Sequence, residues 1–327
     1  MRTLSVTQET WPIRGSFTIS RGAKREAQVV VASISQNGKA GRGECVPYAR
    51  YGESVASVVA QIEAARAQIE AGMNRAELNS AMPAGAARNA LDCALWDLEA
   101  RLAGQAVWKL AGLNAPRPCT TAYTLSLDTP TAMGAAAAKA MDFPLLKLKL
   151  GTDLIVETVA EVHRNAPGAR LIVDANEAWD VELLKQVSPR LKQLNVALIE
   201  QPLAADKDAA LAGINWPVPL CADESCHGID SLTHIRGRYG LINIKLDKTG
   251  GLTAAIELAQ AAQAIGLGIM VGCMVGTSLA MAPAVLLASL AQYVDLDGPL
   301  LLEADRPEGL KFEPGGVLHP PSAALWG

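Results

Sequence analysis

The chain has no large excess of charge of one sign. Its 29 lysine and arginine residues face 33 aspartate and glutamate residues, which leaves a formal net charge of −4. Proteins that hold nucleic acid or an anionic membrane surface use a strong positive field. The charge balance therefore argues against both partners and favours a small neutral or zwitterionic molecule.

The sequence also lacks the cysteine patterns of a disulfide framework or a zinc site. Its six cysteines include no CxxC pair and are scattered through apolar stretches of a chain long enough to build its own core. The N-terminal segment MRTLSVTQETWPIRGSF has no apolar run of the kind that a signal peptide requires. We therefore expect reduced thiols and a cytoplasmic location.

One stretch without charged residues, Leu258 to Val294, is long enough to suggest a membrane span. Gly, Ser, Thr, Gln and Pro283 interrupt it and divide it into pieces of strand and helix length. We predict a buried strand, a loop and a helix here, in a soluble protein.

The first part of the chain has mixed α and β character. A strand is predicted for residues 25–35, a Gly/Pro/Tyr loop for 41–54, and an amphipathic helix that ends at Gly72. A second helix has small residues at four-residue steps, which suits close packing. These residues are Ala86, Ala90, Ala94, Leu98 and Leu102. We predict an α+β capping domain over residues 1–116, completed by the Pro/Gly-rich segment 300–327.

Residues 117–299 alternate short apolar runs with Ala-rich helical stretches. The eight runs begin at Thr120, Leu145, Arg170, Val196, Val218, Leu241, Gly266 and Tyr293. An open doubly wound sheet is an alternative, but no GxGxxG or GxxxxGK[ST] follows the first strand, and eight even units favour closure. The predicted fold is α/β, a modified (β/α) TIM-type barrel with a capping domain.

Three acidic residues lie at the C-terminal ends of neighbouring predicted strands. They are Asp174, Glu200 and Asp223, each one β/α unit after the last. In a β/α barrel these strand ends form the rim on which active sites are built, so the three carboxylates should converge. Without a counter-charge they would repel one another, and an oxygen-only set suits Mg²⁺ better than Zn²⁺. The alternative is that each acid caps the following helix.

Lysines flank these acids on the same barrel. In LLKLKL, Lys147 and Lys149 share one face. Helices cover the outside of a barrel strand, so both lysines should point inward. The same alternation directs five further residues inward. These are Asn243, Lys245, Asp247, Asp295 and Asp297.

Lys149 and Lys245 come from the second and sixth strands, on opposite sides of the barrel and hence on opposite faces of a bound molecule. Close to a cation and to each other, both should have lowered pKa values and act as bases at neutral pH. One would remove a proton and the other return it. A carboxylate held by Mg²⁺ becomes an enediolate when its α-proton leaves, so the pattern indicates racemisation or epimerisation.

The motifs KLKLG, IVDANEAW, IEQPL, CADESCH, NIKLDKTGGL, GCMVGTS and DLDGP occur in this order. In this the chain resembles the enolase superfamily, its muconate-lactonising subgroup, and within it the dipeptide epimerases, especially bacterial L-Ala-D/L-Glu epimerases. GECVPYARYGES and GAARNALDCALWDL resemble the capping domain of that family. The resemblance covers essentially the full chain.

The resemblance implies roles for nine residues. Lys149 and Lys245 would form the acid/base pair, with Lys147 as a helper near the substrate carboxylate. Asp174, Glu200 and Asp223 would bind Mg²⁺, with Mn²⁺ as a substitute. Asp295 and Asp297 would bind the free ammonium group of a dipeptide, for which a strand-end cap with a turn at Gly298 is the alternative. A role in murein peptide metabolism follows from the same resemblance, and a homo-oligomer is left open.

The ninth residue is Lys24, where this sequence differs from the dipeptide epimerases that it resembles. Close relatives carry an arginine in the first capping loop that pairs with the substrate glutamate, and here the matching position is Lys24, followed by Arg25. Arg14, Arg21 and Arg50 are further capping-loop cations, for each of which ordinary surface charge is the favoured interpretation.

Rival functions remain on the same scaffold. N-acylamino acid racemases, o-succinylbenzoate synthases and muconate-lactonising enzymes act on substrates without a free amine, so Asp295 and Asp297 would be misplaced charges. Mandelate racemase relatives and acid-sugar dehydratases need a histidine at the end of the seventh strand, near Gly272 to Met274, where this chain has none. A non-catalytic barrel would have lost a ligand or a lysine, and none is missing.

Overall fold

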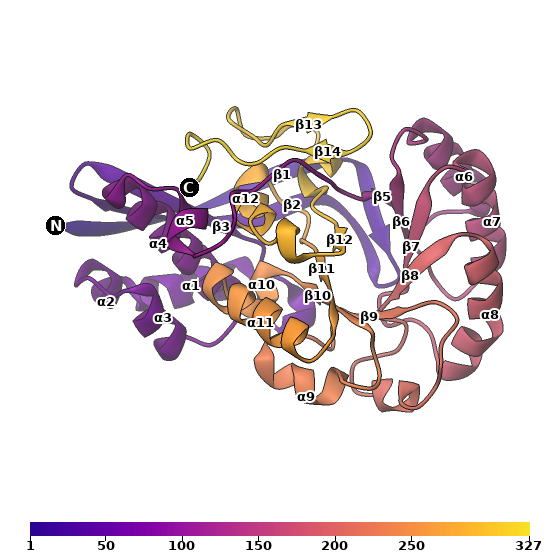
Figure 1. Cartoon of the computed structure of the whole chain (residues 1–327). Helices are drawn as coiled ribbons and strands as arrows, with labels where there is room; N and C mark the ends of the chain where they lie inside the picture. The colour runs from indigo at the N-terminus through magenta and orange to yellow at the C-terminus, as the bar shows by residue number, and fades with distance from the viewer.

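The computed structural model describes residues 1–327 and places two lobes side by side (Figure 1). The N-terminal lobe is an antiparallel sheet in the order β1-β2-β3, covered by four helices. Its elements are β1 (Arg2–Ile19), β2 (Gly22–Gln36), β3 (Lys39–Cys45), α1 (Val55–Ala64), α2 (Arg66–Glu70), α3 (Arg75–Ala81) and α4 (Ala86–Ala103). The tip of the β1–β2 hairpin reaches the barrel, where Leu127 N donates a hydrogen bond to Thr18 O over 3.0 Å.

The contact between β3 and α4 is closer than side chains would allow. A Cβ atom on Gly41 would lie 2.2 Å from Leu98 N, and one on Gly43 would lie 2.1 Å from Ala90 O. The small-residue face of α4 is therefore confirmed, although Leu102 at its end is 40% exposed. The prediction of a loop over residues 41–54 is wrong for its first residues. Gly41 and Gly43 belong to strand β3, which packs directly on α4, and not to a turn.

The second lobe is a barrel of eight parallel strands in sequential order. They are β5 (Tyr123–Leu125), β6 (Leu145–Lys149), β7 (Arg170–Asp174), β8 (Val196–Glu200), β9 (Leu220–Ala222), β10 (Leu241–Ile244), β11 (Gly268–Val271) and β12 (Tyr293–Val294). A hydrogen bond of 2.8 Å from Ala122 N to Val294 O joins the first and last strands. All eight predicted strands are present, and the predicted fold class is confirmed.

The barrel departs from a regular (β/α) barrel in its helices. Full helices are α6 (Pro130–Lys139), α7 (Ile155–Asn165), α8 (Val181–Gln193), α11 (Leu252–Ala264) and α12 (Ser278–Val285). Elsewhere the connections are single turns, namely η2 (Asp208–Leu211), η3 (Ile229–Ser231), α9 (Leu232–Ile235), α10 (Leu246–Thr249), η4 (Ala288–Leu290) and η5 (Gly298–Leu301). No full helix follows β12, so the chain leaves the barrel there and returns to the first lobe.

The C-terminal segment contacts both lobes. Leu302 pairs with Ile13 of β1, and Trp326 Nε1 donates to Cys93 O of α4 over 3.1 Å. The remaining short elements of the chain are η1 (Ala49–Tyr51), α5 (Val107–Leu110), β4 (Cys119–Thr120), β13 (Phe312–Glu313) and β14 (Val317–Leu318), and β4, β13 and β14 share a small sheet. The domain limits proposed from the sequence stay a prediction.

A small apolar cluster fills the inside of the barrel. It consists of Ala122, Leu145, Ile172, Leu198, Cys221, Leu241 and Met270. Leu145, Ile172 and Leu198 each precede a charged residue by two positions on the same strand face. The apolar cluster thus closes one end of the barrel and leaves the charged residues at the C-terminal strand ends. The uncharged run 258–294 forms the end of α11, then β11, α12 and β12, and no helix in the structure is long and apolar enough to cross a membrane.

Candidate active site

Strand register brings the first charged residues together. Lys149 pairs with Asp174 across β6 and β7, and Asp174 pairs with Glu200 across β7 and β8. Asp223 follows β9, and Lys245 directly follows β10. None of the three acids caps the next helix, since α8 is capped by Asp180, which accepts from Leu183 N over 2.8 Å, and η2 and η3 have no side-chain acid cap.

Each of the three carboxylates contacts a lysine. Lys149 Nζ lies 2.5 Å from Asp174 Oδ2, and Lys245 Nζ lies 2.6 Å from Asp223 Oδ2. Lys147 Nζ lies 2.7 Å from Glu200 Oε2 as an ion pair without hydrogen-bond geometry, and 3.3 Å from Asp174 Oδ2. The lysines provide the counter-charge here, and no three His, Cys, Asp or Glu side chains have the arrangement of a metal site.

These ion pairs set the pKa values of the site. Burial alone would lower the pKa of Lys245, but Asp223 and Glu200 raise it well above its usual range. The lowered pKa predicted for Lys245 depends on a cation bound beside it and stays a prediction, whereas the carboxylate 2.6 Å away acts in the opposite direction and outweighs burial. Burial also raises the pKa of Asp174, but Lys149 and Lys147 bring it to about 2. Burial and the charge of Asp174 raise the pKa of Glu200 to about 7.

Two residues outside the predicted set hold the acids in place. Lys248 Nζ donates to Asp223 Oδ1 over 2.6 Å and to Asp223 O over 2.5 Å. Asn243 Nδ2 donates to Glu200 Oε1 over 2.7 Å. Strand alternation indicated the inward direction of Asn243, whereas Lys248 lies in α10, where no strand pattern applies.

Asp247 does not point into the barrel as predicted. Strand β10 ends at Ile244, and Asp247 lies in the following turn α10, so the alternation that was extended to it no longer holds. Its Oδ1 accepts hydrogen bonds from Val46 N over 3.1 Å and Asn89 Nδ2 over 2.8 Å. Asp247 therefore joins the barrel to the N-terminal lobe.

Asp295 and Asp297 lie at the end of the last strand. Asp295 Oδ2 accepts from Lys147 Nζ over 2.7 Å, while its Oδ1 is buried without a partner. Asp297 Oδ2 accepts from Thr124 N over 2.6 Å and makes no side-chain cap for η5, so the strand-end cap interpretation is wrong. Burial and the charge of Asp295 raise the pKa of Asp297 to about 7.

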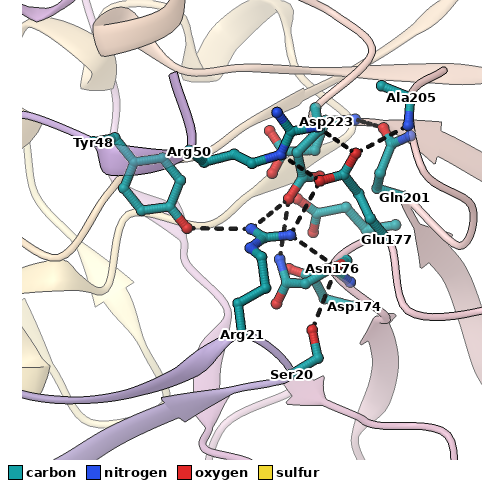
Figure 2. A network of polar contacts seen from close by, with 12 residues as sticks. Ser20, Arg21, Tyr48, Arg50, Asp174, Asn176, Glu177, Gln201, Ala205 and Asp223 are labelled. Atoms are coloured by element: carbon teal, nitrogen blue, oxygen red, sulfur yellow. Dashed lines mark hydrogen bonds and ion pairs between the residues drawn. The ribbon is translucent and has the colours of Figure 1, made fainter. Parts of the chain in front are cut away.

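The N-terminal lobe covers the barrel mouth with charged side chains (Figure 2). Arg21 donates to Glu224 Oε1 over 2.7 Å, and Arg50 forms two hydrogen bonds of 2.8 Å to Glu177. Both arginines thus contact the barrel, which corrects their interpretation as ordinary surface charge. Lys24 is exposed, and its Nζ lies 5.1 Å from the centre of the Tyr48 ring.

A cavity of about 740 Å³ lies between the two lobes. Its barrel side includes Lys147, Lys149, Lys245, Asp295 and Asp297. Its other side includes Lys24, Arg21, Arg50, Tyr48 and Tyr51, while Asp174 and Glu200 lie behind the surface of the cavity. Seven of the nine predicted site residues therefore line one cavity, Asp223 among them.

Both lobes match models of known protein families. Residues 131–322 match the family described as enolase C-terminal domain-like, and residues 1–112 match the mandelate racemase / muconate lactonizing enzyme N-terminal domain. The chain belongs to the enolase superfamily. The superfamily assignment from sequence motifs is thereby confirmed.

Among relatives in the enolase superfamily, the L-Ala-D/L-Glu epimerase of Escherichia coli is 48% identical, over 96% of this chain and 99% of that protein. The N-acetyl-D-glutamate racemase of a Pseudoalteromonas species is 47% identical, over 91% of this chain and 95% of that protein. These relatives are epimerases and racemases, so the enzyme is an isomerase of the superfamily.

Two solved structures share the fold over nearly the full chain. An enolase family member from Agrobacterium tumefaciens with homology to dipeptide epimerases, bound to sodium and L-Ala-L-Glu, is 49% identical, covers 100% of both chains and has a TM-score of 0.97. A dipeptide epimerase from Enterococcus faecalis, complexed with Mg and L-Leu-L-Tyr, is 26% identical, covers 99% of this chain and 98% of that one and has a TM-score of 0.91.

The donor chemistry of this superfamily member fits a hard divalent cation. Asp174, Glu200 and Asp223 are buried carboxylates on neighbouring strands, with no histidine or cysteine among them. Burial and the neighbouring charge of Asp174 raise the pKa of Glu200 although Lys147 and Lys245 lower it, so the set gathers buried negative charge. Oxygen-only ligands with excess negative charge suit Mg²⁺.

Proposed function

We propose that this enzyme is an L-Ala-D/L-Glu epimerase, which inverts the α-carbon of the C-terminal residue of the dipeptide. The observation that carries the proposal is one cavity lined by Lys149, Lys245, Asp295 and Asp297. It combines two amines suited to proton transfer with two acids suited to a substrate ammonium group. Identity of 48% to an L-Ala-D/L-Glu epimerase supports the same substrate.

The two lysines divide the proton transfer between them. Lys149 ends β6 and Lys245 directly follows β10, with β7, β8 and β9 between these strands in the barrel, so the two lysines approach a bound molecule from different sides. One neutral amine takes the α-proton and the opposite ammonium returns a proton to the other face. Inversion follows, because the donor and the acceptor of the proton are different residues.

Asp174, Glu200 and Asp223 would hold Mg²⁺. When bound, Mg²⁺ supplies the charge that neutralises these carboxylates and stabilises negative charge developing on the substrate carboxylate. Lys147, which is buried and paired to Glu200 and Asp295, would place an ammonium group beside that carboxylate. Mn²⁺ is expected to substitute, because it takes similar oxygen ligands.

The second candidate is N-acetyl-D-glutamate racemisation, because a racemase of that substrate is 47% identical. The unpartnered Oδ1 of Asp295 favours the dipeptide. A dipeptide ammonium group provides a hydrogen bond and a positive charge at this position, whereas an N-acetyl group is uncharged and would add no positive charge to that of Lys147 beside the buried acid pair.

The test uses L-Ala-L-Glu and N-acetyl-D-glutamate in D₂O with Mg²⁺. We expect deuterium at the α-carbon of glutamate and formation of L-Ala-D-Glu, with a higher kcat/KM than for the N-acetyl compound. A preference for N-acetyl-D-glutamate would replace our proposal by the second candidate. No exchange with any dipeptide or N-acyl amino acid would refute the two-base chemistry itself.

Single substitutions separate the two lysines. Lys149→Met and Lys245→Met should each stop epimerisation, while one epimer of the dipeptide keeps some deuterium exchange through the remaining lysine. If both variants kept full turnover, the two-base assignment would be wrong. The thermal unfolding midpoint of each variant checks that it folds like the unmodified protein.

We also propose that the enzyme acts in the cytoplasm on dipeptides released from murein, since L-Ala-D-Glu is the dipeptide that its 48% identical relative is named for. Fractionation of cells that express the protein should place the activity with the cytoplasmic fraction. Activity confined to a secreted fraction would contradict this location.

A further inference from the structure

One barrel carboxylate binds two separate segments of the N-terminal lobe. Glu177 lies in the loop between β7 and α8 and accepts hydrogen bonds of 2.8 Å from both Arg50 Nε and Arg50 Nη2. Arg21 Nη1 lies 3.3 Å from the same carboxylate. Arg50 belongs to η1, and Arg21 lies at the tip of the β1–β2 hairpin, so Glu177 is shared between two loops that reach it from different directions (Figure 2).

These ion pairs differ from ordinary surface salt bridges. The Glu177 side chain is 8% exposed, whereas those of Arg21 and Arg50 are 28% and 41% exposed. Burial raises the pKa of Glu177, but the hydrogen bonds from Arg50 and from Ala205 N hold it below its usual value. A buried carboxylate with bidentate arginine and backbone donors is the strong form of ion pair.

The backbone at Glu177 has an uncommon conformation. Asn176 has φ +45° and Glu177 has φ +69°, and left-handed conformations are costly for residues with a side chain. Arg21 Nη1 donates to Asn176 O over 2.8 Å, while Asn176 N donates to Asp174 Oδ1 over 2.9 Å. Asn176 therefore connects a capping-loop arginine directly to an acid of the candidate metal set, and the costly left-handed conformation is that of Glu177.

The two capping loops are also joined to each other and to their own lobe. Arg21 Nη2 donates to the Tyr48 hydroxyl over 3.2 Å. Glu53 accepts from Tyr48 N over 3.0 Å and from Ala86 N, at the start of α4, over 2.8 Å. The base of the second loop is thus fixed on α4. Val46 N and the Tyr51 ring also contact the barrel, at Asp247 and His227, and the exposed Arg50 makes the ion pair with it.

We propose that Glu177 is a positioning residue that latches residues 14–28 and 46–55 onto the barrel rim, closes the cavity over its occupant and couples that closure to the position of Asp174. The latch consists of Glu177, Arg21 and Arg50. Its effect on catalysis rests on the proposed function, but its effect on the loops does not.

Substitution of Glu177 and substitution of Arg21 should loosen different loops, because each removes different ion pairs. Loss of the Glu177 charge leaves Arg50 without its carboxylate, while Arg21 keeps Glu224 and Asn176 O. Glu177→Gln should therefore loosen residues 46–55 more than residues 14–28. Arg21→Gln should loosen residues 14–28 more, because Arg50 keeps its bidentate pair.

Hydrogen–deuterium exchange of the full-length protein, read by mass spectrometry, tests the loops directly. In Glu177→Gln we expect exchange in residues 46–55 to rise about tenfold. Glu177→Asp should recover part of the protection. Glu63→Gln is the matched control, because it removes an exposed arginine pair, to Arg66, outside both loops. It should leave exchange in both segments unchanged.

Steady-state kinetics give the second measurement. Glu177→Gln should raise KM for L-Ala-L-Glu about tenfold with a smaller change in kcat, since open loops lose contacts with the bound substrate. A variant affected only in overall stability would lose active enzyme and lower the apparent kcat without raising KM. Glu63→Gln should match the unmodified enzyme.

Unchanged exchange in both segments of Glu177→Gln would overturn the latch, whatever the substrate is. If Glu177→Gln does not fold, Arg50→Gln removes the same bidentate pair from the exposed side and must give the same loosening of residues 46–55. If the unmodified enzyme epimerises no dipeptide, the proposed function fails, and the exchange experiment still decides the latch.

Discussion

Asp247 lies at the contact between the barrel and the N-terminal lobe, where it is 7% exposed. Its Oδ1 accepts hydrogen bonds from Val46 N and Asn89 Nδ2. Burial, together with the negative charges of Glu53 and Glu44, raises its pKa from 3.8 to about 7. We predict that Asp247→Asn stabilises the fold above neutral pH, because asparagine keeps the oxygen acceptor and has no charge to bury.

The direction of the pH effect on stability follows from proton binding by Asp247. Asp247 has a higher pKa in the folded state than in the unfolded state, so folding takes up a proton between these two values. The stabilising contribution is fully present below about pH 4 and is lost as the pH rises towards 7. A difference of about three pKa units, at about 1.4 kcal/mol each, corresponds to about 4 kcal/mol.

Urea unfolding at pH 5, 6, 7 and 8 measures this contribution in the two proteins. Titration of all other groups occurs in both, so the difference in the free energy of unfolding isolates residue 247. Asp247→Asn should gain stability over the unmodified protein by about 1.4 kcal/mol per pH unit up to about pH 7 and show a constant advantage above it. A difference that is independent of pH would refute the raised pKa, and a difference that falls with pH would refute its direction.

The remaining predictions concern the metal, the packing and the specificity of the site. Chelation with EDTA should abolish epimerisation, and added Mg²⁺ should restore it, as measured by optical rotation. Gly43→Ala should lower the free energy of unfolding by about 1–3 kcal/mol through the clash with Ala90 O, whereas Gly168→Ala, with open space around its Cβ position, should be tolerated. Lys24→Ala should lower kcat/KM for L-Ala-L-Glu about tenfold and leave that for L-Ala-L-Leu nearly unchanged, if its ammonium group pairs with the glutamate side chain.

The barrel was predictable from the sequence because its strands carry a local signal. The runs are short and apolar, and most are followed by a polar residue, so these strands and their C-terminal ends can be located without knowledge of the rest of the fold. The inward direction of Lys147, Lys149 and Asn243 followed from alternation within one strand. The same argument failed at Asp247, since alternation applies only while the chain remains extended and β10 ends at Ile244.

The parts that could not be predicted depend on contacts between distant segments. The glycines of β3 resemble loop residues in isolation, and only the approach of α4 explains them. Arg21 and Arg50 carry no local sign of a partner, because Glu177 and Glu224 lie more than 120 residues away along the chain. The raised pKa of Lys245 likewise follows from its ion pair with Asp223, which could not be inferred from sequence position.

The distribution of charge in the cavity also bears on the substrate. Lys147 is paired with Asp295 and Glu200, yet two carboxyl groups of the site have pKa values raised to about 7. One is Glu200, beside Asp174, and the other is Asp297, beside Asp295. Burial is the first cause of both shifts and the charge of the neighbouring acid the second, so buried negative charge gathers at two separate places, at the three acids of β7 to β9 and at the end of β12. On the proposed function, a divalent cation would supply positive charge at the first place and a substrate ammonium group at the second, so a free dipeptide would suit this cavity better than an N-acyl amino acid.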